Sequence, residues 1–364
     1  MGASACLSGM SALAYWRETR RRIARDNAMD ADDPAYKPLL VRLLSDEHCE
    51  LNLDAMPRRQ NASSLPASID LASVRKAVSV LPPNDAEPLE LLVNRAQGRR
   101  YFGGTRVRVF SLELPEGSIC HIDSGLAAPS PEMTLLLLAS QVGVFSLAQL
   151  VCEFCGLYSL EGAGFFNVPP LTSLLSVGDF ALEVERLAAS AGKRAPLGLP
   201  GLRGALDLSV ERSASPAETA CALLMSVSRR RGGYGLPRPQ MNYTVAVGSG
   251  SYVCDLAWPG KRVALEYQSD LHGSTVRQSA DRTKLNALQS AGYTVMQVGK
   301  EDLKRLKRTD GVASLLGAAL GVSPLRPSEA FRRRQIDLRK VLLAGWWGEE
   351  PSAKPAECDK GLKQ

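Results

Sequence analysis

The sequence predicts an α/β protein in which an N-terminal α+β part precedes a C-terminal α-β-β-β-α-β unit with a central mixed sheet. Alternating apolar and polar residues mark short strands in both parts. Over residues 213–306, three such strands lie in a row between two helices whose ends are well marked. A stretch rich in glycine and proline over 192–204 separates the two parts and is the best internal boundary.

Composition excludes several classes of protein. The chain has 364 residues, 45% apolar and 23% charged, which is ordinary globular usage and enough for two to three domains. Its eight cysteines are too sparse for a disulfide scaffold, and no secretory signal pattern is present, so we expect a reduced, cytoplasmic protein. The uncharged run Met133–Cys152 predicts a buried helix, a break at Gly143 and a second helix, and no membrane span.

The N-terminal half predicts two segments. Residues 1–68 are expected to form a helical extension, with Ser11 capping a helix that runs to about Arg25. Residues 69–200 are expected to form an α+β domain. A strand-like alternation over 105–114 belongs to it.

The C-terminal half has the clearest signals for helices and strands. Ser215, Pro216 and Glu218 form the pattern of a capping box at a helix start. We assign 205–322 to the α-β-β-β-α-β domain and 323–364 to a basic, then polar, tail. The elements expected after the first helix are strands over 243–247, 252–258 and 262–268, a helix over 278–290 and a strand over 293–298.

Two acids of this unit are expected to meet. A two-residue hairpin loop at 260–261 would place Asp255 directly opposite Glu266. Gln268 lies two residues further along the strand and therefore on the same face. Opposed carboxylates repel each other unless a cation lies between them, and Mg²⁺ or Mn²⁺ with oxygen ligands would fit. The alternative is a pair of solvated carboxylates on an exposed hairpin face.

These residues resemble a known nuclease superfamily. The phrases Val253-Cys-Asp-Leu-Ala-Trp-Pro259 and Val263-Ala-Leu-Glu-Tyr-Gln-Ser-Asp-Leu-His272 look like the PD-(D/E)XK nucleases, as do Asp281-x-x-Lys284 and the stretch 288–295. More narrowly, they resemble the branch akin to very-short-patch-repair endonucleases, in proteins related to actinobacterial abortive-infection antitoxins. The resemblance covers about residues 213–306 and implies a restriction-endonuclease-like core. The N-terminal half resembles the same antitoxin-related proteins at Ser11–Arg17, Ser130–Glu132 and Leu150–Gly156, which implies an antitoxin-like domain over 69–200 with a regulatory or DNA-positioning role.

The resemblance implies roles for individual residues. Asp255 and Glu266 match the two acids of the motif and are implied metal ligands. Gln268 stands where the superfamily name has Lys, and it can orient a water molecule by hydrogen bonds. Glu218 matches an acid that many relatives carry on the first helix as a metal ligand, and its capping role explains it equally well.

Two cationic positions follow from the same comparison. His272 lies where relatives carry a histidine, as a general base or phosphate contact, or it is a loop residue bonded locally. Lys284 replaces the usual arginine of the helix motif and is expected to contact nucleic acid.

Basic residues are concentrated near the C-terminus. Residues 300–340 contain eleven basic side chains and five acids, a net charge of +6 that equals the charge of the whole chain. Within this stretch Lys304, Lys307 and Arg308 are candidate contacts to a phosphate backbone, and a solvated helix face is the alternative. A second cluster has the same two interpretations and consists of Arg17, Arg20, Arg21, Arg22 and Arg25. The C-x-x-C pair Cys152 and Cys155 is interpreted as buried structural thiols.

Two functions are therefore open. The first is a Mg²⁺-dependent DNA endonuclease with Asp255, Glu266 and Gln268 at the metal. The second is a nuclease-derived regulator or antitoxin-like protein that binds DNA without cutting it. In both, DNA is the expected partner and a membrane is not, while a toxin or self-association partner stays open. Gln268 favours the second function, and the intact acid pair favours the first.

Overall fold

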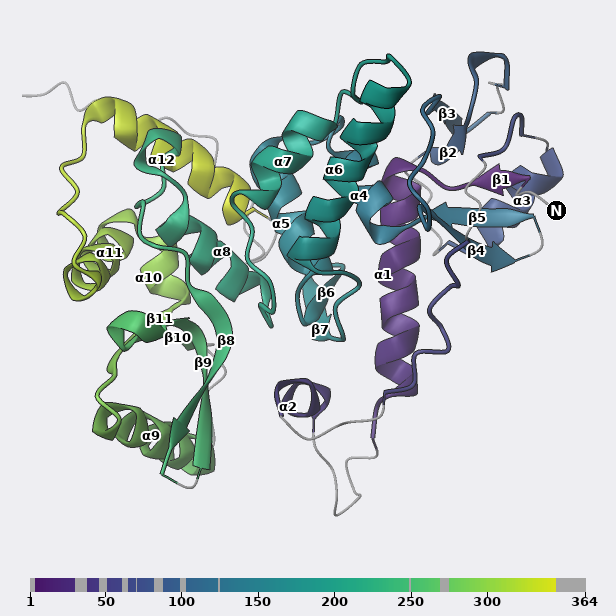
Figure 1. Cartoon of the computed structure of the whole chain (residues 1–364). Helices are drawn as coiled ribbons and strands as arrows, with labels where there is room; N and C mark the ends of the chain where they lie inside the picture. The colour runs from purple at the N-terminus through teal and green to yellow at the C-terminus, as the bar shows by residue number, and fades with distance from the viewer. Residues whose placement is uncertain are drawn as a thin grey trace, which may run out of the picture.

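The computed structural model describes a mixed α/β protein with four small sheets and twelve α-helices in the covered residues (Figure 1). The structure describes only part of the chain, and at residues 71, 73 and 275–281 it describes the backbone without the side chains. The covered residues are 4–29, 38–45, 51–60, 65–69, 71–81, 88–98, 103–123, 125–248, 250–268 and 275–344.

The N-terminal end of the molecule contains two of the sheets and a long helix. β1 pairs in parallel with β5, which is antiparallel to β4, and β2 pairs in parallel with β3. A strand therefore precedes the first helix, where the sequence predicts helices alone. The elements are β1 (Ala5–Cys6), α1 (Gly9–Asp26), α2 (Leu39–Leu44), α3 (Leu71–Ser79), β2 (Leu89–Val93), β3 (Thr105–Val109), β4 (Ile119–Asp123) and β5 (Leu126–Pro129).

Two details of this end differ from the sequence prediction. Ser8, and not Ser11, occupies the N-cap of α1. The hydroxyl of Ser11 instead accepts a hydrogen bond from the backbone N–H of Glu90, at 2.9 Å. The strand expected over 105–114 ends at Val109, because its parallel partner ends with the pair Val93 and Val109.

The middle of the chain is mainly helical. The expected helix, break and second helix are confirmed as α4 and α5 on either side of Gly143, and the Ser130 hydroxyl caps α4 by accepting the N–H of Met133. Among the described residues, no helix combines the length and apolar character that crossing a membrane requires. The elements are α4 (Pro131–Leu138), α5 (Val144–Phe154), β6 (Tyr158–Glu161), β7 (Gly164–Asn167), α6 (Leu174–Ser190) and α7 (Leu199–Leu206).

The C-terminal half contains the expected α-β-β-β-α-β order. Its sheet has the strand order β11-β10-β9-β8, with β10 and β11 parallel and the other neighbours antiparallel, so it is a mixed sheet. The elements are α8 (Pro216–Ser226), β8 (Gln240–Val247), β9 (Gly250–Trp258), β10 (Val263–Gln268), α9 (Thr275–Ser290) and β11 (Thr294–Gly299).

The hairpin between β9 and β10 has the predicted register with a different turn. Residues 259–261 form a short 3₁₀ turn and Arg262 adopts a left-handed conformation with φ 51°, so the connection is longer than two residues. Leu265 nevertheless pairs with Leu256. Continuing this register by one pair places Asp255 opposite Glu266.

Both faces of this sheet are covered. On one face, Leu256 and Leu265 join the main hydrophobic core together with residues of α8. On the other, Ala257 and Ala264 pack in a smaller core with Leu288 of α9. Neither face of the sheet is therefore simply open to water.

The chain continues after the sheet as basic helices. α12 packs against α5 and α8, so the segment predicted as a tail over 323–364 begins with a packed helix; residues 345–364 lie outside the described part. Figure 1 shows these helices beside the C-terminal sheet, with α4–α7 between them and the N-terminal sheets. The elements are α10 (Lys300–Lys304), α11 (Leu306–Leu320) and α12 (Glu329–Leu342), and the 3₁₀ turn η2 (Arg229–Arg231) follows α8.

Candidate functional site

The two predicted acids and one predicted cation come together at the C-terminal sheet. Asp255 lies on β9, Glu266 on β10, and Lys284 on the helix α9 that covers this face. The Lys284 ammonium donates a hydrogen bond to Oε2 of Glu266. Lys284 therefore lies beside the two acids. Its side chain is only 26% exposed, so it is not a lysine of the outer surface.

Glu266 is the most enclosed member of this group. It is 6% exposed, which excludes a solvated position for this carboxylate. Burial, and then the charge of Asp255, raises the pKa of Glu266 to about 7. Its second oxygen, Oε1, is buried and meets no hydrogen-bond donor of good geometry among the described residues, although the nearby Cys254 thiol acts to lower the pKa of Glu266. A buried carboxylate oxygen without a well-placed donor is costly, and it fits a site that receives a metal ion or a water molecule.

Asp255 is held by the backbone of the neighbouring strand. Its Oδ2 accepts the N–H of Tyr267 at 2.7 Å, which fixes the carboxylate beside β10. Burial raises the pKa of Asp255, while the charge of Lys284 acts in the opposite direction. Burial also acts to lower the pKa of Lys284, but the charges of Glu266 and Asp255 outweigh it and raise that pKa, so the lysine is cationic at neutral pH.

Glu218 has a local structural role. Its Oε1 accepts the Ser215 hydroxyl, and its Oε2 accepts the N–H of Ala214 and the side-chain N–H of Asn242. The Ser215 hydroxyl in turn accepts the Glu218 N–H, so Ser215 caps α8 as the sequence predicts, and the Glu218 carboxylate bonds the N–H of Ala214, one residue before the cap. Burial, followed by the charge of Asp255, raises the pKa of Glu218 to about 8. Within the described ranges, no group of three or more His, Cys, Asp or Glu side chains converges as a ready metal cluster.

The structure describes Gln268 but not His272. Gln268 is the last residue of β10, half-buried, and paired with Gly299 of β11. It lies two residues beyond Glu266 along the strand, as the sequence predicts. His272 lies outside the described residues, and its role stays a prediction.

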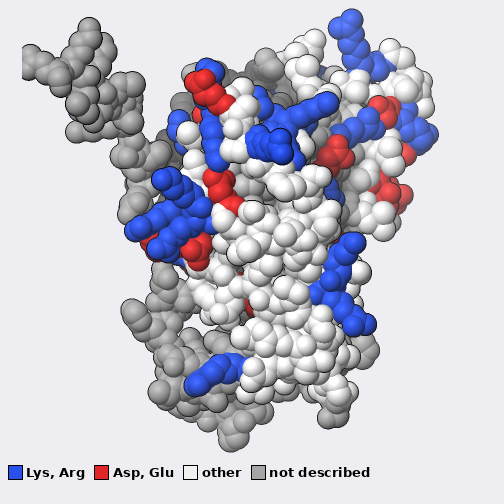
Figure 2. Space-filling view, turned by 90° about the vertical axis from the view of Figure 1, so that its left-hand side faces the viewer, with Lys and Arg blue, Asp and Glu red and all other residues white. Residues whose placement is uncertain are grey.

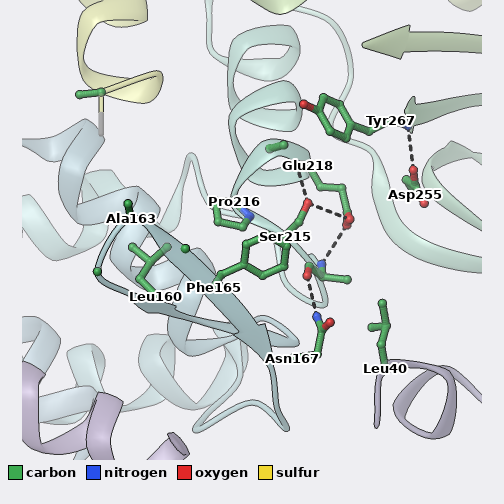
Figure 3. Close-up of a pocket in the computed structure, with 15 residues that line it drawn as sticks. Leu40, Leu160, Ala163, Phe165, Asn167, Ser215, Pro216, Glu218, Asp255 and Tyr267 are labelled. Carbon is green, nitrogen blue, oxygen red and sulfur yellow. Dashed lines mark hydrogen bonds between the residues drawn. The ribbon is translucent and has the colours of Figure 1, made fainter. Parts of the chain in front are cut away.

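A pocket of about 550 Å³ opens beside the acids (Figure 3). One wall comes from the C-terminal unit and includes Glu218, Asp255 and Tyr267. The opposite wall includes Phe165 and Asn167 of the β6–β7 hairpin. The pocket therefore joins residues that lie far apart in the sequence, and sequence reasoning did not find the hairpin residues.

The C-terminal helices carry most of the predicted nucleic-acid contacts. Lys307 and Arg308 are exposed on α11, and Arg308 forms a 3.5 Å ion pair with Asp302, while Lys304 ends α10 half-buried. Figure 2 shows this face of the molecule with clusters of Lys and Arg beside uncharged surface. Three further exposed arginines, which sequence reasoning did not identify as a group, come from η2 and α12, and these two elements pack against each other. They are Arg230, Arg231 and Arg334, which we call the η2–α12 patch.

Two of the five residues of the N-terminal arginine cluster, Arg17 and Arg20, have a structural role. Arg20 is 1% exposed and donates to the backbone carbonyls of Glu153, Gly156 and Pro169. Arg17 forms a bidentate ion pair with the buried carboxylate of Glu153. These two arginines hold α1 to the middle of the chain, so their presence is explained by internal contacts and requires no ligand.

The C-x-x-C pair is buried, as the sequence predicts. Cys152 and Cys155 are 0% and 2% exposed. Burial raises the pKa of Cys152 to about 11, so this thiol stays protonated and unreactive at neutral pH.

The chain is similar to proteins of Mycobacterium tuberculosis. It is 30% identical over 139 residues to an uncharacterised protein of strain CDC 1551 / Oshkosh and to one of strain H37Rv. Each match covers 36% of this chain and 49% of the relative, so the chain spans about half the length of the curated relatives it matches. No protein-family model matches the chain. No solved structure matches it either.

Proposed function

We propose that the protein is a metal-dependent DNA endonuclease whose C-terminal half is a restriction-endonuclease-like core of the PD-(D/E)XK type. One observation carries the proposal. Asp255, Glu266 and Lys284 project from three consecutive elements to one place, and a buried Glu266 oxygen lacks a hydrogen-bond donor of good geometry among the described residues. Two carboxylates and one cation are a composition suited to phosphodiester hydrolysis.

Each residue has a role in this proposal. Asp255 and Glu266 would hold Mg²⁺ or Mn²⁺, which supplies activation of a water molecule and neutralisation of phosphate charge. Lys284 places a permanent positive charge where negative charge develops in the transition state. Gln268 can orient the attacking water by a hydrogen bond. Glu218 is assigned to helix capping and to the shape of the pocket, not to the metal.

The basic face supports DNA as the substrate. Cations on α10, α11 and the η2–α12 patch would contact backbone phosphates and position the strand without reading its sequence. A protein that acts on DNA in this way would work in the cytoplasm. The role of the N-terminal half would be to place the DNA or to regulate the nuclease.

A regulator that binds DNA without cutting it is the second candidate. The neutral side chain of Gln268 favours it, because it cannot supply the charge that the motif's lysine provides. The Lys284–Glu266 ion pair also favours it, since a lysine already bound to a carboxylate is less available to a phosphate.

A nicking assay on supercoiled plasmid separates the two candidates. We expect wild-type protein to nick with Mg²⁺ and not with EDTA, and Asp255→Asn to bind DNA without nicking. The matched control is Asp207→Asn, which changes an acid on the exposed end of α7 by the same chemistry and should nick normally. Absence of Mg²⁺-dependent nicking on duplex, flap and single-stranded DNA, together with specific binding of one duplex, would support the regulator.

A further inference from the structure

The pocket beside Asp255 has a wall that the nuclease chemistry does not require. Metal and phosphate need the acids and Lys284, yet the pocket extends away from them to the β6–β7 hairpin (Figure 3). Its volume, about 550 Å³, lies within the range of small-molecule binding sites. The hairpin belongs to the N-terminal half, so this wall gives that half a direct position at the candidate active site.

The hairpin presents an aromatic ring to the pocket. Phe165 lines the cavity and is 47% exposed, so its ring is accessible to an occupant of the pocket. Its ring is held edge-to-face against Tyr158, with centroids 6.2 Å apart and planes at 85°. Leu160 and Pro216 add apolar surface on the same cavity. A flat apolar group could therefore pack on a ring whose orientation is already fixed.

One polar group of the hairpin is oriented as an acceptor. The Asn167 side-chain amide donates to the backbone carbonyls of Leu157 and Ala214, at 3.0 and 2.8 Å. Both donor hydrogens are thereby used, and the carbonyl oxygen of the amide is left to accept a hydrogen bond. An occupant with an N–H group on its edge would complement it.

The acids of the pocket disfavour a bare phosphate inside it. Glu218 and Asp255 line the cavity, whereas the cations Lys284, Lys304 and Arg308 do not. An occupant here should be uncharged, planar and apolar on its faces, with N–H donors on its edge. A nucleobase has all of these properties, and aromatic side chains commonly stack with unpaired bases.

We propose that this pocket binds one unpaired nucleobase of the DNA strand whose phosphate is attacked at Asp255 and Glu266. The inference rests on the proposed nuclease function and narrows its substrate class to DNA with an unpaired nucleotide next to the scissile bond. Phe165 stacks on the base, and the Asn167 carbonyl accepts from its edge. A fully paired duplex leaves the pocket empty.

The test compares three short DNAs in EDTA, where cleavage cannot occur: a perfect duplex, the same duplex with one unpaired adenosine, and the same duplex with an unpaired abasic nucleotide. We expect wild-type protein to prefer the unpaired adenosine over both others by roughly tenfold, the scale of one stacked base. Phe165→Leu, which keeps apolar bulk without the ring, should lose this preference. It should keep the affinity for perfect duplex, which depends on the basic face.

Controls separate this inference from the nuclease proposal. Leu175→Ala removes another exposed apolar side chain, 73% exposed on α6, and should leave the preference intact. Because Phe165 is half exposed, thermal unfolding of Phe165→Leu should match that of wild type. An equal preference in wild type and Phe165→Leu, or equal binding of abasic and adenosine DNA, overturns the pocket assignment even if Mg²⁺-dependent cleavage is present. A Phe165-dependent preference without cleavage supports the pocket and rejects the nuclease.

Discussion

The ammonium of Lys284 and the carboxylate of Glu266 form a partly buried ion pair across the interface between α9 and the C-terminal sheet. The pair occupies one oxygen of Glu266 and leaves Oε1 without a hydrogen-bond donor of good geometry among the described residues. A permanent cation therefore stands beside Asp255 and Glu266 although the strand itself carries Gln268.

Metal binding should depend on Asp255 and Glu266 and not on Glu218. Asp255→Asn and Glu266→Gln each remove a charged oxygen ligand, and we expect Mg²⁺ affinity to fall at least ~10-fold in each, the minimum typical of losing even an outer-sphere partner. Glu218→Gln is the matched control, because both Glu218 oxygens already accept hydrogen bonds. Isothermal titration calorimetry measures all four proteins. Equal affinity in all of them would place the metal elsewhere.

The titration of Glu218 should shape stability against pH. Its pKa in the folded protein is about 8, above the ordinary value of 4.5. Between these values the native protein keeps a proton that the unfolded chain has lost, so the free energy of unfolding should fall as pH rises, by about 5 kcal/mol in total.

Urea unfolding at several pH values between about 5 and 8 tests this effect. Glu218→Gln removes the titration, so its free energy of unfolding should change less over this range than that of wild type. The variant also loses an accepted hydrogen bond at every pH, so the slope, and not the absolute stability, is diagnostic. Parallel slopes would show that Glu218 ionises normally.

Local signals made much of the C-terminal fold predictable. Ser215 and Glu218 mark the start of α8, and Gly292 follows the end of α9 as a C-terminal glycine with φ 81°. The register that brings Asp255 to Glu266 depended only on the midpoint of one hairpin. The observed register is the predicted one although the turn is longer than predicted, because the burial of one strand face sets the pairing.

The rest depended on packing between distant segments. The position of Lys284 is set by how α9 rotates on the sheet, and sequence alone indicated only a basic helix residue. The capping and metal interpretations of Glu218 predict the same residue type; its hydrogen bonds to Ser215 and Asn242 show a structural role, and the metal role stays a prediction. Phe165 lies 90 residues before Asp255 in the chain, and no motif connects the two.

Salt dependence should separate the two basic surfaces. Replacing Lys304, Lys307 and Arg308 together by Gln should reduce the slope of log affinity against log salt by roughly 2 to 3, if each contacts a duplex phosphate. The same change at Arg230, Arg231 and Arg334 measures the η2–α12 patch. Fluorescence anisotropy with a labelled duplex gives both slopes. An unchanged slope for one set would assign that surface to solvent.

Arg20 should contribute to stability and not to DNA binding. Arg20→Met leaves three carbonyl oxygens at a buried site without their donor, and we expect a loss of about 3–5 kcal/mol in the free energy of unfolding. Arg22→Met on the same helix is the control; its side chain is 49% exposed and should cost less than about 0.5 kcal/mol. Urea unfolding measures both variants, and equal effects would contradict the buried network.

Lys284 is the candidate to replace the strand lysine of the nuclease motif, because the strand carries Gln268 at that position. Lys284→Met keeps the length of the side chain and removes the charge. If the ammonium stabilises the transition state, the nicking rate should fall by about 10² to 10³, the usual cost of one such group. Glu266 would also lose its partner, so its carboxyl should hold a proton more tightly and metal binding should weaken at neutral pH.

A second substitution separates a catalytic cation from a structural one. Gln268→Lys places an ammonium on β10, two residues beyond Glu266 on the same strand face. In the Lys284→Met background it should restore at least part of the lost rate, while in wild type it should change the rate little, because one cation is already present. Thermal unfolding of all four proteins reports the structural contribution in parallel. If Lys284→Met lowers stability but leaves the rate of the remaining folded protein unchanged, Lys284 only balances the charge of Glu266. If Gln268→Lys recovers the rate without recovering stability, the charge itself is what the reaction uses.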